Sequence, residues 1–130
     1  MHMRKFTAML SILTVWLLFL PACAGSAQLQ LDNTATFAKC RKGDTVKITL
    51  DGNPSTGYRW DFENESPYVV ELESEDIVSQ NNNLVGAPAR QVFLFSARKA
   101  GKSTIVFKYR RPWEKAQKPV FEVVYTIVVE

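Results

Sequence analysis

Histidine is all but missing from this chain of 130 residues, because its single histidine is His2. The imidazole group is the most frequent general base in enzymes and a frequent zinc ligand. Beyond the N-terminus the chain therefore lacks the Ser–His and Cys–His pairs of nucleophilic catalysis. A carboxylate pair, such as Asp61 or Glu63 with Glu114, is the remaining catalytic arrangement, but nothing in the sequence brings these groups together. We expect no enzymatic activity, no metal site and no cofactor.

Cysteine is scarce as well, with Cys23 and Cys40 only. Two thiols cannot supply the four ligands of a structural zinc site. If Cys23 is lipidated, Cys40 is a lone thiol, which we expect to be buried beside a strand. If Cys23 stays a thiol in an oxidising compartment, a Cys23–Cys40 disulfide is the alternative.

An excess of charge of one sign is also lacking. The chain has 16 basic and 13 acidic residues, and the basic count falls to 14 when Arg4 and Lys5 of the N-terminal segment are set aside. Proteins that bind nucleic acid through its phosphates usually carry a strong basic excess. The near-neutral balance argues against nucleic acid as a partner.

A long apolar run occurs once, at residues 6–20. Arg4 and Lys5 precede the run and small residues follow it, which is the pattern of an export signal too short to be a membrane span. Leu-Pro-Ala-Cys at 20–23 resembles a bacterial lipobox, in which the cysteine becomes the lipidated first residue. Cleavage after Ala27 by the ordinary signal peptidase is the alternative.

These features predict a lipoprotein-type signal peptide at 1–22, a tether at 23–28 and one domain at 29–130. A domain of this length can bury its own core. A lipid on Cys23 would anchor the protein in the bacterial cell envelope, on the periplasmic side or the surface. Without acylation the protein would be secreted.

Helical periodicity is absent from the domain, and strand periodicity takes its place. Apolar and polar residues alternate at 45–50, 58–62, 103–109 and 120–129. About seven short strands separated by turns predict an all-β fold, an immunoglobulin-like antiparallel β-sandwich. The side chains expected to face its core are Val46, Ile48, Leu50, Tyr58, Trp60, Phe62, Ile105, Phe107, Tyr109, Phe121, Val123, Tyr125, Ile127 and Val129.

Three further segments complete the predicted sandwich. Residues 29–37 indicate a weak first strand, and residues 68–72 a short strand. An acidic run at 71–76 is typical of an exposed edge. Residues 90–97 are apolar on both faces and predict a central strand.

Three loops of such a sandwich, at 53–58, 84–90 and 110–119, would gather at one end and form a binding surface. The first reads Asn53-Pro54-Ser55-Thr56-Gly57-Tyr58. The proline ring fixes one φ and the glycine permits a positive φ, so the small polar residues between them would be held at the apex. The same residue types are common in plain surface turns, so the loop alone leaves that interpretation open.

This first loop resembles the Asn-Pro-Thr-Thr-Gly-Tyr loop of the chagasin family, protein inhibitors of papain-like cysteine peptidases. Two further family elements follow in the expected order across the domain. Arg111-Pro112-Trp113 matches the family's Arg-Pro-Trp loop before the last strand. Gly86-Ala87-Pro88-Ala89-Arg90 matches in part the Gly-X-Gly-Gly loop before an aromatic strand.

The resemblance implies tight, reversible binding to a papain-like cysteine peptidase, and we expect the protein to be a monomer. Ser55 and Thr56 would approach the catalytic Cys and His of the peptidase. Trp113 would lie on aromatic residues of the cleft, and Arg111 would reach an acidic or carbonyl group. The structural alternatives are that Trp113 covers the edge of the sandwich and that Arg111 is simply solvated, and we expect Tyr58 in the core in either case.

The second loop departs from the family pattern. Pro88 has no backbone N–H, and Ala89 adds bulk where the family has glycine. A backbone hydrogen bond donated by residue 88 is therefore excluded. We expect a lower affinity or a different preferred peptidase.

Two other functions fit the same architecture. The first is an envelope-anchored sandwich that binds a carbohydrate, with Trp113 stacking on a sugar, or another envelope protein. The second is a strand-exchange assembly partner, which needs an exposed apolar edge. Val120, Val124 and Val128 of the last strand leave this second function open.

Overall fold

The computed structural model describes residues 25–80 and 86–130, which form eight strands and one short 3-10 helix. The strands are β1 (Gln28–Leu31), β2 (Phe37–Cys40), β3 (Thr45–Gly52), β4 (Arg59–Asn64), β5 (Val70–Ser79), β6 (Ala89–Ala97), β7 (Gly101–Arg110) and β8 (Phe121–Val129). The helix η1 (Pro54–Thr56) lies between β3 and β4. The prediction of an all-β fold is confirmed.

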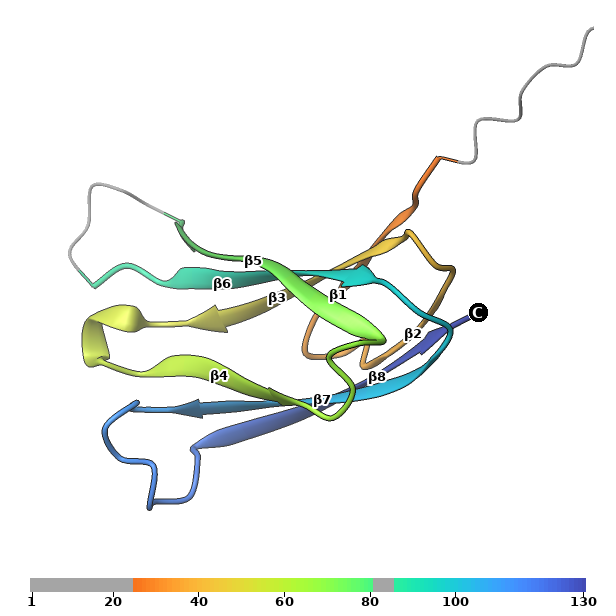
Figure 1. Cartoon of the computed structure of the whole chain (residues 1–130). Coiled ribbons are helices and arrows are strands. Elements are labelled where there is room, and N and C mark those ends of the chain that lie inside the picture. The colour runs from red at the N-terminus through yellow and green to blue at the C-terminus, as the bar shows by residue number, and fades with distance from the viewer. Residues whose placement is uncertain (1–24, 81–85) are drawn as a thin grey trace, which may run out of the picture.

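The strands form two four-stranded sheets that stack on each other (Figure 1). The strand orders are β1-β3-β6-β5 and β2-β8-β7-β4. β1 runs parallel to β3, and β2 runs parallel to β8, whereas the other pairs are antiparallel. The predicted β-sandwich of about seven strands is confirmed, with eight strands and with two parallel pairs that make both sheets mixed.

The segment predicted as one weak first strand consists of two strands in different sheets. Between them the Asp32 carboxylate accepts hydrogen bonds from the backbone N–H groups of Thr34 (2.8 Å) and Ala35 (3.0 Å). The hydroxyl of the buried Tyr125 donates to the Asp32 carbonyl oxygen (2.7 Å). Burial raises the pKa of Tyr125 to about 12, and the negative charge of Asp32 adds to the shift. This pinned turn carries the chain from one sheet to the other.

The core lies between the sheets and is centred on Phe107. Its ring lies 4.8 Å from the ring of Phe93 and 5.5 Å from the rings of Phe62 and Tyr125, distances at which tilted and edge-to-face pairs are favourable. The predicted core residues that are buried are Val46, Ile48, Leu50, Trp60, Ile105, Phe107, Tyr125, Ile127 and Val129. The core formed by the described residues extends from Leu31 to Val129 and lies within residues 25–130.

Phe121 is not a core residue, contrary to the prediction, because 62% of it is exposed. It pairs with Tyr109 at the ends of β7 and β8, and the two ring centres are 6.2 Å apart. The rest of the Phe121 ring faces solvent. Alternation assigns a side chain to a face of its strand, but it does not show where the opposite sheet stops covering that face.

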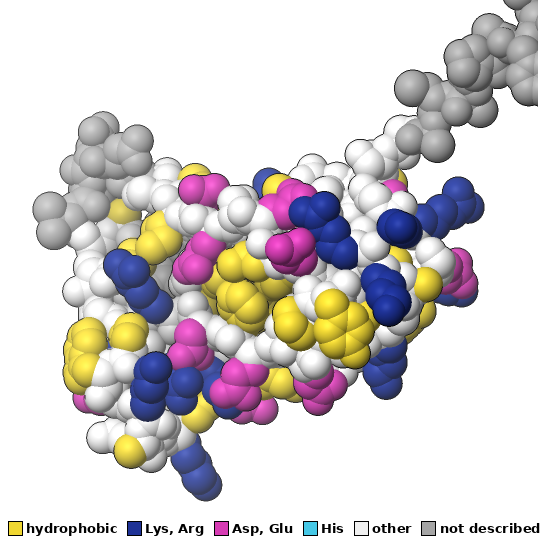
Figure 2. Space-filling model, in the orientation of Figure 1, with side chains coloured by type: hydrophobic (Ala, Val, Ile, Leu, Met, Phe, Trp, Pro, Cys, Tyr) yellow, Lys and Arg dark blue, Asp and Glu magenta, His cyan; other side chains and the backbone are white. Residues whose placement is uncertain are grey.

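β5 is an edge strand, and its acidic residues Glu71, Glu73, Glu75 and Asp76 are exposed, as predicted. β5 is longer than the predicted strand at 68–72, because its exposed second half pairs with β6 as far as Ser79. Acidic and basic side chains are interspersed over the face drawn in Figure 2. That mixture agrees with the near-neutral charge balance of the domain.

Cys40 is buried in β2 and is a free thiol among the described residues. Burial raises the pKa of the Cys40 thiol, and the charge of Asp44 adds to this effect, so the reactive thiolate is disfavoured. No helix within residues 25–80 and 86–130 is long and apolar enough to cross a membrane. The predicted signal peptide and the lipidation site at Cys23 lie outside the described residues.

Candidate functional site

The first loop, the third loop and the described ends of the second loop lie together at one end of the sandwich, at the left of Figure 1, as the sequence predicted. The first loop (53–58) joins β3 to β4, the second (80–88) joins β5 to β6, and the third (111–120) joins β7 to β8. Of the second loop the structure describes Gln80 and residues 86–88. The first loop borders on both of the others.

The first loop is fixed by hydrogen bonds within itself. The Asn53 side-chain oxygen accepts hydrogen bonds from the Ser55 N–H (3.2 Å) and the Ser55 hydroxyl, and the Thr56 hydroxyl donates to the Asn53 carbonyl (2.7 Å). Pro54 begins η1, and Gly57 closes it with a φ of 81° and a hydrogen bond from its N–H to the Pro54 carbonyl (3.1 Å). The exposed hydroxyls of Ser55 and Thr56 thus direct their protons into the loop and keep acceptor lone pairs free.

The third loop contacts the first through Trp113. A β-carbon added to Gly57 would stand 2.7 Å from the Trp113 ring, so the indole lies directly on the glycine backbone. Trp113 is nevertheless 70% exposed. The indole therefore packs on the first loop with one part and presents the rest to solvent.

The stacked rings of Tyr58 and Tyr109 support the first loop on the side that faces the sandwich. The rings of Tyr58 and Tyr109 are 5.4 Å apart and stacked, and the Tyr109 hydroxyl accepts a hydrogen bond from the backbone N–H of Asn53 (3.0 Å). Tyr58 is half-buried in this stack and not in the core, contrary to the prediction. The reason is that β4 begins only at Arg59, so Tyr58 lies beyond the end of the strand.

Arg111 belongs to the same stack. Its guanidinium lies 4.7 Å from the centre of the Tyr58 ring and 3.5 Å from the Glu114 carboxylate. Its buried Nε has no hydrogen-bond partner among the described atoms. A guanidinium on an aromatic face is attracted by the ring quadrupole. Arg111 therefore joins the third loop to the first in the free protein.

Two consecutive turns shape the tip of the third loop. The Glu114 N–H donates to the Arg111 carbonyl (3.0 Å), and the Gln117 N–H donates to the Glu114 carbonyl (3.1 Å). Pro112 occupies the second position of the first turn, where its fixed φ is favourable. Trp113 takes the third position and projects from the turn.

The second loop approaches the apex of the first at Gly86. This glycine has a φ of 82°, and a β-carbon on it would lie 3.9 Å from the Ser55 hydroxyl oxygen. Ala87 is half-buried, and Pro88 is exposed. These three residues are the part of the predicted second element that lies in the described loop.

The other two residues of that element, Ala89 and Arg90, belong to β6. Ala89 is buried and pairs with Gly52, so its side chain is not available at the surface. Arg90 forms an ion pair with Asp51 (3.2 Å) across the outer face of the sheet. Strand β6 therefore starts one residue earlier than predicted.

A hollow of about 450 Å³ lies on the outer face of the sheet β1-β3-β6-β5. Its lining includes Lys47, Thr49 and Val92 but no aromatic side chain. Stacking on an aromatic ring is the usual way in which such a face would hold a sugar. This hollow therefore gives no support to the carbohydrate alternative.

The carboxylates weighed as a catalytic pair are each held by a different cation. The pairs are Asp61 with Arg110 (2.8 Å), Glu63 with Lys108 (2.7 Å) and Glu114 with Arg111 (3.5 Å). The hydrogen bond from Lys108 lowers the pKa of Glu63. Within residues 25–80 and 86–130, no three His, Cys, Asp or Glu side chains are grouped to hold a metal ion.

Comparison with known proteins assigns the chain to a protein family. Residues 39–127 match the family model described as chagasin family peptidase inhibitor I42. The chain belongs to the chagasin family. It is 35% identical over 89 residues to amoebiasin-2 of Entamoeba histolytica, across 66% of this chain and 71% of that protein. It is 33% identical over 78 residues to chagasin of Trypanosoma cruzi, across 55% of this chain and 68% of that protein.

Solved structures agree with membership of the chagasin family. The crystal structure of a cysteine protease inhibitor from Entamoeba histolytica has a TM-score of 0.71 at 30% identity and covers 81% of this chain and 97% of its own. PbICP-C in complex with falcipain-2 shares the fold, with a TM-score of 0.56 at 18% identity, over 81% of this chain and 91% of its own. These matches confirm the resemblance to the chagasin family that the sequence motifs indicated. The members of this family are peptidase inhibitors and not enzymes.

Sequence reasoning did not identify the part that several side chains play in supporting the loops or in joining the two sheets. Tyr109 is predicted only as a core residue, and Asp61 only as a member of a catalytic pair, whereas Arg110 and Gln91 carry no predicted role. Asp61 and Arg110 lie on neighbouring strands of one sheet. That relation becomes visible only when the pairing of β4 with β7 is known.

Proposed function

We propose that this protein inhibits papain-like cysteine peptidases by filling their active-site cleft with its three loops. The observation that carries the proposal is the internally bonded first loop, in a member of a family of peptidase inhibitors. A 3-10 turn closed by its own hydrogen bonds offers no extended peptide bond for cleavage. Entering a cleft without being cut is what an inhibitor of this kind has to do.

The chemistry of the loop apex suits the catalytic centre of such a peptidase. The hydroxyls of Ser55 and Thr56 already donate to Asn53, so outward they offer hydrogen-bond acceptors. A protonated catalytic histidine is a strong donor, and bonds from a charged donor are the stronger ones. The apex would therefore satisfy the imidazolium and occupy the place of the attacking water.

Preorganisation supports tight binding. The first and third loops are joined by Trp113 on Gly57 and by Arg111 on Tyr58 before any partner is present. Little loop entropy is then lost on association. Exposed Trp113 offers an aromatic anchor, and tryptophan is among the residue types that most often dominate interface energy. Pro88 gives no backbone donor to the peptidase, so we expect a weaker contribution from the second loop.

The site would also be well oriented on an anchored protein. Ala27, just before β1, bonds to Asp44 and Thr45 at the end of the sandwich away from the loops (Figure 1). We propose that the protein is tethered through a lipid on Cys23 in a bacterial envelope and acts as a monomer. The loops would then point away from the membrane. Mass spectrometry of the mature N-terminus would show the diacylglyceryl group or exclude it.

Trp113→Ala tests whether the loop end is the inhibitory surface. We expect the inhibition constant against papain to rise about 30-fold, as for loss of an aromatic hot spot. Tyr68→Ala is the matched control, because Tyr68 is 66% exposed and lies in the connection between β4 and β5 at the other end. Equal inhibition by Trp113→Ala and the parent protein would remove Trp113 from the site.

A further inference from the structure

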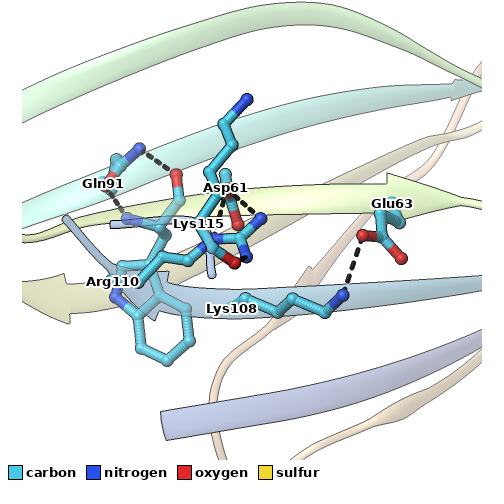
Figure 3. A network of polar contacts seen from close by, with 7 residues as sticks. Asp61, Glu63, Gln91, Lys108, Arg110 and Lys115 are labelled. Atoms are coloured by element: carbon cyan, nitrogen blue, oxygen red, sulfur yellow. Dashed lines mark hydrogen bonds and ion pairs between the residues drawn. The ribbon is translucent and has the colours of Figure 1, made fainter. Parts of the chain in front are cut away.

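Arg110, the residue just before the Arg-Pro-Trp element, is directed into the protein and not toward a partner. Its Nε and one terminal nitrogen contact the same Asp61 oxygen at 2.9 Å and 2.8 Å (Figure 3). Its side chain is only 16% exposed. The charge is therefore satisfied and largely covered within the inhibitor.

The same guanidinium also reaches the third loop. Its other terminal nitrogen donates to the carbonyl oxygen of Lys115 at 3.5 Å, as the cluster in Figure 3 shows. Lys115 follows the Trp113 turn, and Arg110 precedes it. The contact thus connects the two ends of the segment 110–115, which carries Trp113. The ion pair of Arg110 with Asp61 attaches this segment to β4.

A second ion pair on the same two strands lacks the link to the loop. Lys108 and Glu63 also join β7 to β4, at 2.7 Å, with the lysine side chain 21% exposed. Among the described residues, the Lys108 ammonium group forms a hydrogen bond with the Glu63 carboxylate alone. Two ion pairs therefore join β4 to β7, and of these only the Asp61–Arg110 pair also contacts the third loop.

We propose that Asp61 and Arg110 are positioning residues for inhibition, which set the place of Trp113 without touching the peptidase. This inference rests on the proposed function. A fork of guanidinium donors can hold a carboxylate and a carbonyl oxygen at the same time, whereas the point charge of a lysine cannot keep this geometry. The contacts of Arg110 with Asp61 and with the Lys115 carbonyl oxygen form what we call the clamp. Arg110→Lys should therefore weaken inhibition as loss of the clamp does, although the net charge is unchanged.

The test compares Asp61→Ala with Glu63→Ala in residues 25–130, titrated against papain. We expect Asp61→Ala and Arg110→Lys to raise the inhibition constant about tenfold, a size typical of coupled neighbouring residues, and Glu63→Ala to leave it unchanged. Both alanine variants remove the carboxylate of one ion pair between β4 and β7, with the Asp61 side chain 42% and the Glu63 side chain 66% exposed, so their folding stability should fall by similar amounts. An equal rise for Glu63→Ala would mean a general effect of charge and would overturn the proposal.

A double-mutant cycle separates positioning from direct contact. If Asp61 acts through Trp113, adding Asp61→Ala to Trp113→Ala should cause little further loss of inhibition. Full additivity of the two losses would instead place Asp61 against the peptidase and would contradict the inference.

One readout does not depend on inhibition. Residues 25–130 contain two tryptophans, Trp60 and Trp113, so two indole N–H signals can be followed by NMR in the free protein. Asp61→Ala should shift or broaden the Trp113 signal, and Glu63→Ala should not. If the parent protein does not inhibit papain but the Trp113 signal responds to Asp61→Ala and not to Glu63→Ala, the proposed function is wrong, whereas the positioning of Trp113 by Asp61 and Arg110 is supported. If the parent protein inhibits papain but the Trp113 signal does not respond to Asp61→Ala, the proposed function holds and the positioning role of Asp61 and Arg110 is wrong.

Discussion

Gly57 is the residue on which the junction of the first and third loops depends. Two separate constraints meet there: a φ of 81°, which glycine adopts without strain, and the Trp113 indole on its α-carbon. The sequence predicts the first constraint, because a glycine after Pro-Ser-Thr indicates a turn. The second joins residues 56 positions apart, and no local pattern reveals it.

Gly57→Ala should separate these two constraints. Gly43 provides the matched control, because its φ is 95° but a β-carbon there would meet nothing within 4 Å. Both substitutions should lower the free energy of unfolding by about 1–2 kcal/mol through backbone strain. Only Gly57→Ala should also weaken inhibition of papain, by about tenfold, since it displaces Trp113. A similar inhibition constant for both variants would show that the packing of Trp113 on Gly57 has no part in binding.

Arg111 and Tyr58 show the same limit of sequence reasoning. Their motifs place them in loops, and the structure keeps them there. Arg111 was predicted to contact the peptidase and Tyr58 to lie in the core. In the structure the Arg111 guanidinium lies 4.7 Å from the centre of the Tyr58 ring, and this contact joins the third loop to the first. Such a joint depends on which loops are neighbours, and this is a property of the topology.

At the scale of elements, β4 is an edge strand, and a side chain of the other sheet forms hydrogen bonds with its free backbone groups. The buried Gln91 of β6 accepts a hydrogen bond from the Trp60 N–H (2.9 Å) and donates to the Trp60 carbonyl (2.9 Å) and to Glu75 (2.7 Å). All the polar atoms of the amide are used. Gln91 thereby ties the edge of one sheet to the edge strand β5 of the other.

Gln91→Leu should therefore destabilise the fold severely. The substitution keeps an apolar side chain of similar size but leaves two backbone groups of Trp60 without partners, for an expected loss of about 2–4 kcal/mol in the free energy of unfolding. Urea denaturation of residues 25–130 measures it, with the exposed Gln30→Leu as the control, expected within about 0.5 kcal/mol of the parent. A loss for Gln91→Leu as small as the control's would mean that the amide does not hold the sheets together.

The strands themselves were largely predictable, because alternation in β3, β7 and β8 reports a half-buried surface directly. Phe121 and the two strands β1 and β2 were not. Phe121 is exposed because the sandwich ends beside it, and β1 and β2 separate because Asp32 and Tyr125 pin a turn between the sheets. Both depend on contacts between residues far apart in the sequence.

At the scale of the whole molecule, the sandwich holds three loops at one end and receives its N-terminal segment at the other (Figure 1). The mixed charge on the face in Figure 2 provides no broad surface of one sign. The proposed recognition of a peptidase would rest on the shape and rigidity of the loop end. The two sheets keep the loops in place because the core between them is aromatic and closely packed.

The most direct test of this account is titration of papain with residues 25–130, following residual activity and the integrity of the inhibitor together. We expect papain activity to fall stoichiometrically at low inhibitor concentration and to recover on dilution, and we expect the inhibitor chain to stay uncut. Full peptidase activity at a large excess of the protein, or cleavage within residues 53–58, would contradict it.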